Sequence, residues 1–273
     1  LEAFRPLERR ATIERTWHLA DTTEDADGGR LRAFLVRRWQ RRPGNLARCE
    51  RRKHVFSLLY MLAFALVLSL IGYDLVMAAD PHWYSTLFGA YSFAKAIYMG
   101  LGALIILAAV LQLRPGNGFE IPASHFHDVG KLFFAFCLVW ADFFYAQLVV
   151  IWYGNISEET TYIIERVMTA PWNILAWVVF IVCFIVPFLV LLNKKVKTLP
   201  RFMMVFCGVI IAGMWLEHLL LLGPALNHHA TSIPLGITDV LITMGFFGLM
   251  AFAVSGYLKQ FPELVRVGRK EVA

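Results

Sequence analysis

Charged residues are scarce in this 273-residue sequence. Asp, Glu, Lys and Arg together make up 17% of it, whereas a typical soluble domain holds about 25%. Hydrophobic residues reach 58%, and the mean hydropathy is +0.58. This balance excludes an ordinary soluble domain and predicts an all-α integral membrane protein.

Cysteine is also rare, and its four positions form no known ligand set. Cys49, Cys137, Cys183 and Cys207 make neither a CxxC nor a CxxCH motif, and three of them lie in apolar runs. This placement indicates small core side chains. The sequence also lacks a P-loop, a GxGxxG turn and a Ser-His-Asp arrangement. We therefore expect no metal site, disulfide framework or catalytic residue in this chain.

Eight histidines are the remaining candidates for haem or metal ligation. A buried b-type haem needs opposed His ligands well inside two helices, and only His218 lies within an apolar segment, near its end. His125 and His127 are two residues apart, so on a helix they would diverge by about 200°. The sequence predicts that any redox centre belongs to a partner subunit.

A polar, basic arm precedes six apolar segments. Residues 1–54 contain 14 of the 26 Lys and Arg residues, and residues 30–42 have the pattern of an amphipathic helix at a membrane surface. Because the arm leads directly into a membrane span, we expect no nucleic-acid partner. Each segment approaches the roughly 20 residues that cross a bilayer. The segments are 56–79, 87–112, 127–153, 172–193, 202–222 and 236–258. We expect a six-helix transmembrane bundle over 55–260 and a cytoplasmic tail over 261–273.

Glycine and proline within the spans predict local packing. Gly100, Gly102, Gly245 and Gly248 would permit close approach of neighbouring helices. Pro187 interrupts the fourth segment, where it removes a backbone donor and should kink the helix.

The loops alternate in charge. Those at 80–86 and 223–235 contain no Lys or Arg, and the loop at 154–171 is acidic, with Glu158, Glu159 and Glu165. The loop at 193–201 holds four basic residues, and the tail is basic too. The positive-inside rule therefore places both termini in the cytoplasm. The acidic loop would lie outside, where we expect it to dock a partner.

The third segment combines spanning length with ionisable side chains. Asp128, Lys131, Asp142 and Tyr145 share one helical face by their spacing. Ionisable groups in hydrocarbon are expensive, so such residues are functional candidates. We hypothesise that Asp142 is a proton relay near Lys95. The alternative is a plain Asp142–Lys95 pair that joins the second and third helices.

Proton-transfer candidates fall into two sets. The inner set lies at the start of the third segment and includes Asp128 and Lys131. The outer set has one ionisable residue in each of five segments: Asp74, Lys95, Asp142, Glu217 and Asp239. If protons cross through this chain, the two sets would form inner and outer half-channels. If not, the charges are interhelical pairs. The candidates are Asp142, Lys95, Asp74, Glu217, His218, Asp239, Asp128, Lys131 and Tyr145.

Three stretches resemble one family of membrane subunits. They are YDLVMAADPHWYSTLFGAYSF (73–93), HDVGKLFFAFCLVWADFFYAQLVVIWYGNISEET (127–160) and VPFLVLLNKKVK (186–197). Their DPHW turn, D-x-G-K-L helix start, W-Y-x-N helix end and E-E-T motif are similar to the NrfD-like membrane subunit of bacterial alternative complex III, of ActF type. The resemblance covers about residues 55–260. Two motifs depart from the family pattern: Asp142 and Ala146 replace an aromatic residue and a serine, and Leu75 replaces a tryptophan.

The resemblance implies a subunit of a quinol:cytochrome c oxidoreductase in the bacterial inner membrane, rather than a catalyst alone. The implied partners are a second NrfD-like subunit, a c-type cytochrome and an iron–sulfur protein. Haem c and iron–sulfur clusters would lie in those partners, and quinone or menaquinone is the implied small molecule. The implied fold is an NrfD-like helix bundle, of which the six helices would match the C-terminal part.

Two other functions remain open. The chain could be a non-catalytic scaffold that anchors haem and iron–sulfur subunits. It could also be a secondary transporter, although the sequence shows no inverted repeat and no paired broken helices.

Overall fold

The computed structural model describes residues 46–81, 83–113, 121–227 and 232–260, and within these ranges its regular structure is entirely helical. Six helical stretches are long and apolar enough to cross a membrane, as the sequence predicted. They are Arg51–Ala79, Phe88–Leu113, Ala123–Gly154, Trp172–Leu191, Pro200–Leu226 and Ile237–Lys259. The surface helix predicted at 30–42 and the tail at 261–273 lie outside the described residues.

The chain divides into two compact units. Glu50–Gly236 is one unit, and it holds five of the six candidate spans. The sixth span, helix α10 (Ile237–Gln260), belongs to the other unit and is described by itself.

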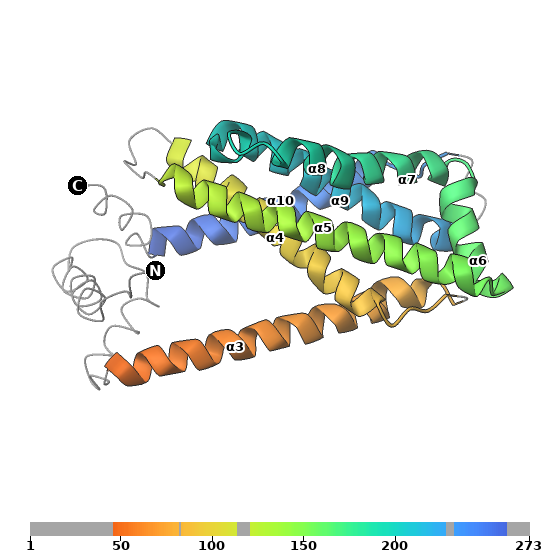
Figure 1. The fold of residues 1–273 in the computed structure, drawn as a ribbon, viewed down its shortest axis with the longest axis horizontal. Coiled ribbons are helices and arrows are strands. Elements are labelled where there is room, and N and C mark those ends of the chain that lie inside the picture. Colours follow the sequence, from red (N-terminus) through yellow and green to blue (C-terminus); the bar gives the residue numbers. More distant parts are fainter. Residues whose placement is uncertain (1–45, 82, 114–120, 228–231, 261–273) are drawn as a thin grey trace. The chain divides into compact units, whose positions relative to one another are not determined.

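The five spans of the larger unit are built from α3 (Leu46–Ile71), α4 (Phe88–Leu113), α5 (Ala123–Gly154), α7 with α8 (Trp172–Phe180 and Val186–Leu191) and α9 (Pro200–Leu226). Helices α4, α5 and α9 and the α7–α8 pair run alongside one another (Figure 1). Helix α3 contacts α4 through its C-terminal part, where the Ser69 hydroxyl donates to the Gly89 carbonyl at 3.1 Å.

Helix α9 is the most buried of the candidate spans, and two of its glycines allow close packing. A Cβ at Gly213 would lie 2.7 Å from Cys183 Sγ, and one at Gly223 would lie 2.2 Å from the Trp172 ring. On α4, a Cβ at Gly102 would lie 3.2 Å from the Phe133 ring, whereas one at Gly100 meets nothing within 4 Å. The predicted close packing is therefore present at Gly102 and absent at Gly100 within the described chain.

Pro187 alters the fourth span as its chemistry requires. The helix takes π geometry over Ile181–Ile185 before α8 begins. Because Pro187 has no N–H, the carbonyl of Cys183, four residues earlier, loses its α-helical donor. Two side chains take that place: the Tyr98 hydroxyl donates at 3.3 Å and the Cys137 thiol at 3.6 Å. The freed carbonyl thus ties the fourth span to α4 and α5.

The ends of the long helices follow from local chemistry. Helix α9 starts at Pro200, a position where a missing N–H costs nothing. Helix α5 ends where Asn155 adopts a left-handed conformation with φ 46°, and its N–H donates to the Ile151 carbonyl. The short helix α6 (Ser157–Ile163) and a π-helical turn, η3 (Ile164–Met168), then lead to α7.

Candidate functional site

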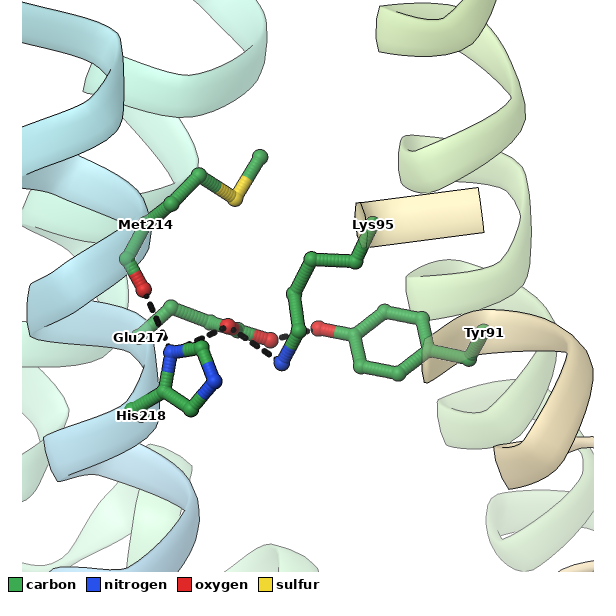
Figure 2. Close-up of polar contacts among 5 residues, drawn as sticks. All are labelled: Tyr91, Lys95, Met214, Glu217 and His218. Carbon is green, nitrogen blue, oxygen red and sulfur yellow. Dashed lines mark hydrogen bonds and ion pairs between the residues drawn. The ribbon is translucent and has the colours of Figure 1, made fainter. Parts of the chain in front are cut away.

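A buried polar cluster lies between α4 and α9. Tyr91 and Lys95 come from α4, and Glu217 comes from α9 (Figure 2). The Lys95 ammonium lies 2.9 Å from Glu217 Oε2, and the Tyr91 hydroxyl donates to Glu217 Oε1. Glu217 is completely buried, and Lys95 and Tyr91 are 5% and 1% exposed. Both carboxylate oxygens therefore have a donor.

Helical spacing explains how α4 supplies two of these groups. Tyr91 and Lys95 are four residues apart, so they lie one above the other on the same face. The Lys95 ammonium is 5.1 Å from the centre of the Tyr91 ring. A carboxylate and an ammonium buried together need both mutual contact and further hydrogen bonds to offset their lost hydration. Tyr91 supplies that further bond.

His218 follows Glu217 on α9 and lies between the buried cluster and the surface of the unit. Its Nδ1 lies 2.9 Å from the Met214 carbonyl and 3.7 Å from Glu217 Oε2 (Figure 2). The His218 side chain is 42% exposed, in contrast to Glu217. If Nδ1 carries the proton donated to Met214, Nε2 keeps a lone pair that can accept a proton.

A second network joins the helix ends on one side of the unit. Arg166, in η3, donates from Nη2 to the Leu221 carbonyl at 2.8 Å, and its Nη2 lies 3.4 Å from Asp80 Oδ2. The guanidinium lies 3.5 Å from the Tyr162 ring centre, and that ring stacks on Trp83 at 3.9 Å. Burial raises the pKa of the Tyr162 phenol to about 12, against a smaller opposing effect of Arg166.

A cavity of about 60 Å³ lies between this network and the cluster. Tyr91 contributes to its lining from the cluster, and Tyr162 and Arg166 contribute from the network. Gln147 of α5 adds a further polar group to walls that are otherwise mostly apolar. Arg166 Nε is buried and has no hydrogen-bond partner among the described residues. The cavity lining therefore includes polar side chains of the network and one residue of the cluster, Tyr91.

The structure contradicts the Asp142–Lys95 pair, which was the alternative to a proton relay at Asp142. Lys95 is paired with Glu217, and Asp142 is exposed on α5. The reason is helix orientation: Phe133 is completely buried in the core, and Asp142 follows it by nine residues, which is about 180° around the helix. Asp142 therefore points away from α4, and the predicted pair is wrong.

The other predicted residues divide between the cluster and the surface. Asp128 and Lys131 form an exposed i, i+3 pair at 2.7 Å within α5, so the alternative that they join two helices as an interhelical pair is wrong. Tyr145 is 64% exposed, and Asp74 is exposed too. Asp239 begins α10, where its backbone carbonyl accepts a hydrogen bond from Thr243. Of the nine candidates, Lys95, Glu217 and His218 come together.

Arg166 is the important residue that sequence reasoning did not select. It counted only as one positive charge in an acidic loop. Its position four residues after Tyr162, close to the start of a span, is the signal that could have identified it.

Among the described residues, no three His, Cys, Asp or Glu side chains gather closely enough to hold a metal ion. A scan against protein-family models matches no family, and a search of curated proteins finds no match for this chain.

Proposed function

We propose that this chain is a membrane subunit of a quinol-oxidising electron-transfer complex similar to alternative complex III, and that it moves protons through the buried cluster. The three motif stretches support the class of complex. The observation that supports proton transfer is Glu217, which is fully buried in a candidate span and bridged to Tyr91 and Lys95. We place the chain in a bacterial inner membrane with both termini in the cytoplasm, on the charge of its loops.

Glu217 suits a relay because its neighbours also exchange protons. A phenol, an ammonium and an imidazole lie around one carboxylate. Burial disfavours the charge on Lys95 and the charge on Glu217 separately, whereas their contact favours both charges together. A proton that reaches Glu217 from one side can therefore leave to the other without a large movement of the helices.

The cavity supplies a route to the cluster. Its volume of about 60 Å³ has room for a few water molecules, each needing roughly 10–15 Å³ by this measure. Such waters would find donors and acceptors on Arg166, Gln147 and Tyr91. His218, half-exposed beside Glu217, offers the second connection.

Quinol oxidation belongs to a partner in this proposal. Small-molecule sites usually enclose about 300–1,000 Å³, so this cavity of about 60 Å³ is not proposed as a quinone site. The haem c and iron–sulfur clusters are likewise assigned to partner subunits. This chain would couple their electron transfer to proton movement.

A non-catalytic scaffold is the second candidate, and one observation favours it. The Lys95–Glu217 contact joins α4 to α9, so its role could be purely to hold the two helices together.

Glu217→Gln distinguishes the two functions, because it removes the titrating group while its amide oxygen can still accept a hydrogen bond from Lys95. In the purified complex in liposomes, a relay predicts a lowered proton-to-electron ratio in the complex that assembles. A scaffold predicts an unchanged ratio in that complex. Asp128→Asn, at an exposed carboxylate, is the matched control. If no haem or iron–sulfur protein purifies with the chain, the assignment to this class of complex is wrong.

A further inference from the structure

The outward face of α5 carries an unusual pattern for a helix that meets only lipid. Asp128, Ala135 and Asp142 recur at intervals of seven residues, and Leu138 and Tyr145 lie between and after them. All five are exposed on the unit that contains α5. Two carboxylates and a small residue on one exposed face are unfavourable towards lipid, and such a face is typical of a contact with protein.

Asp142 lies at the centre of the apolar part of this helix. The run from Leu132 to Tyr153 contains one ionisable carboxylate, Asp142, in its middle. At 1.5 Å per residue the run is about 33 Å long, close to the roughly 30 Å of a bilayer core. Asp142 is thus about 15 Å from either end, too far for its short side chain to reach water.

Among the described residues of the unit Glu50–Gly236, the Asp142 carboxylate has no hydrogen bond or ion pair. Lys95, the cation that the sequence placed near it, is paired with Glu217. A carboxylate exposed to hydrocarbon is costly, and such groups almost always pair or face protein or water. Helix α10, in the other unit, has no Lys or Arg between Ile237 and Leu258, so we expect the positive partner of Asp142 on another chain.

We infer that this face of α5, around Asp142, binds a transmembrane helix of a different subunit that presents an arginine or lysine at the depth of Asp142. A negative charge at mid-membrane depth selects a positive group, and that depth selects a helix, because irregular backbone is not tolerated in lipid. A second copy of this chain is the wrong occupant. A two-fold axis along the membrane normal would bring Asp142 against Asp142, two like charges in hydrocarbon.

Cross-linking in native membranes tests the surface without disturbing Asp142. A photo-reactive amino acid at Tyr145, which is 64% exposed, should cross-link to one transmembrane peptide of another subunit that contains a Lys or Arg. The same probe at Leu189 of α8, which is 61% exposed, is the matched control and should not capture that peptide. Products with lipid only, with a second copy, or within the chain itself would overturn the inference.

A charge swap tests the chemistry of the contact. Asp142→Lys should release the partner on detergent extraction, and the reciprocal change of the partner's basic residue to Asp should restore it. Asp142→Asn should retain part of the partner, because an amide still accepts a hydrogen bond. Unchanged retention by Asp142→Lys, or no recovery in the swapped pair, contradicts the inference. The inference does not depend on proton transfer through Glu217, because Asp142 lies on a different helix, α5, and on its exposed face.

Discussion

Removing the positive charge of Lys95 should destabilise the protein strongly. Lys95→Met keeps most of the side-chain volume but leaves Glu217, which is 0% exposed, without its ammonium at 2.9 Å. The Tyr91 hydroxyl would then be the remaining hydrogen-bond donor to the carboxylate, with His218 Nδ1 at 3.7 Å. Breaking a buried ion pair by removing one partner costs about 3–5 kcal/mol. We expect a loss of that size in the free energy of unfolding.

The double variant Lys95→Met, Glu217→Met should recover much of this loss. Replacing a buried pair by apolar residues of similar volume is often neutral, because no uncompensated charge remains. The coupling energy is obtained from four proteins: the unmodified chain, Lys95→Met, Glu217→Met and the double variant. It also reports the charge state of the pair. Neutral hydrogen bonds between membrane helices average only about 0.6 kcal/mol, so a coupling of several kcal/mol indicates that Lys95 and Glu217 are both ionised.

Equilibrium unfolding in mixed micelles, followed by circular dichroism, measures all four proteins. The matched control is Lys131→Met, which breaks the exposed Lys131–Asp128 pair of 2.7 Å. Exposed pairs contribute little because water already solvates both charges. The reasoning is refuted if Lys95→Met costs no more than Lys131→Met, or if the double variant is as unstable as the sum of the two single ones.

Two further predictions concern packing and pH. Gly223→Ala would place a Cβ 2.2 Å from the Trp172 ring and should cost about 1–3 kcal/mol through overpacking. Gly208→Ala on the same helix meets nothing within 4 Å and should gain about 0.5–1 kcal/mol. Equal effects in the unfolding assay would contradict the close approach of α7 and α9. Because burial raises the pKa of Tyr162 from 10.0 to about 12, the unfolded chain releases this proton first, and stability falls as pH rises from about 10 to 12. In Tyr162→Phe the free energy of unfolding should fall less over this pH range. Parallel curves of stability against pH for the two proteins would contradict the raised pKa of Tyr162.

The six spans could be predicted from sequence because spanning length and apolarity are local properties. The observed starts and ends differ from the expected ones by a few residues, as at α5, which begins at Ala123 rather than at residue 127. Pro187 likewise indicated a local departure from α geometry, although not which side chains would meet the freed carbonyl. The resemblance to NrfD-like subunits and the cytoplasmic position of both termini stay predictions.

Only the tertiary structure decided which faces point inward. Periodicity correctly put Asp128, Lys131, Asp142 and Tyr145 on one face of α5, but it could not tell whether that face was buried. In a soluble helix the apolar side identifies the core. In a membrane, lipid is as apolar as the protein interior, so both faces of a helix have similar composition. The partner of Lys95 therefore depended on the rotation of α4 and α9, which brought Glu217 to it from 122 residues away along the chain.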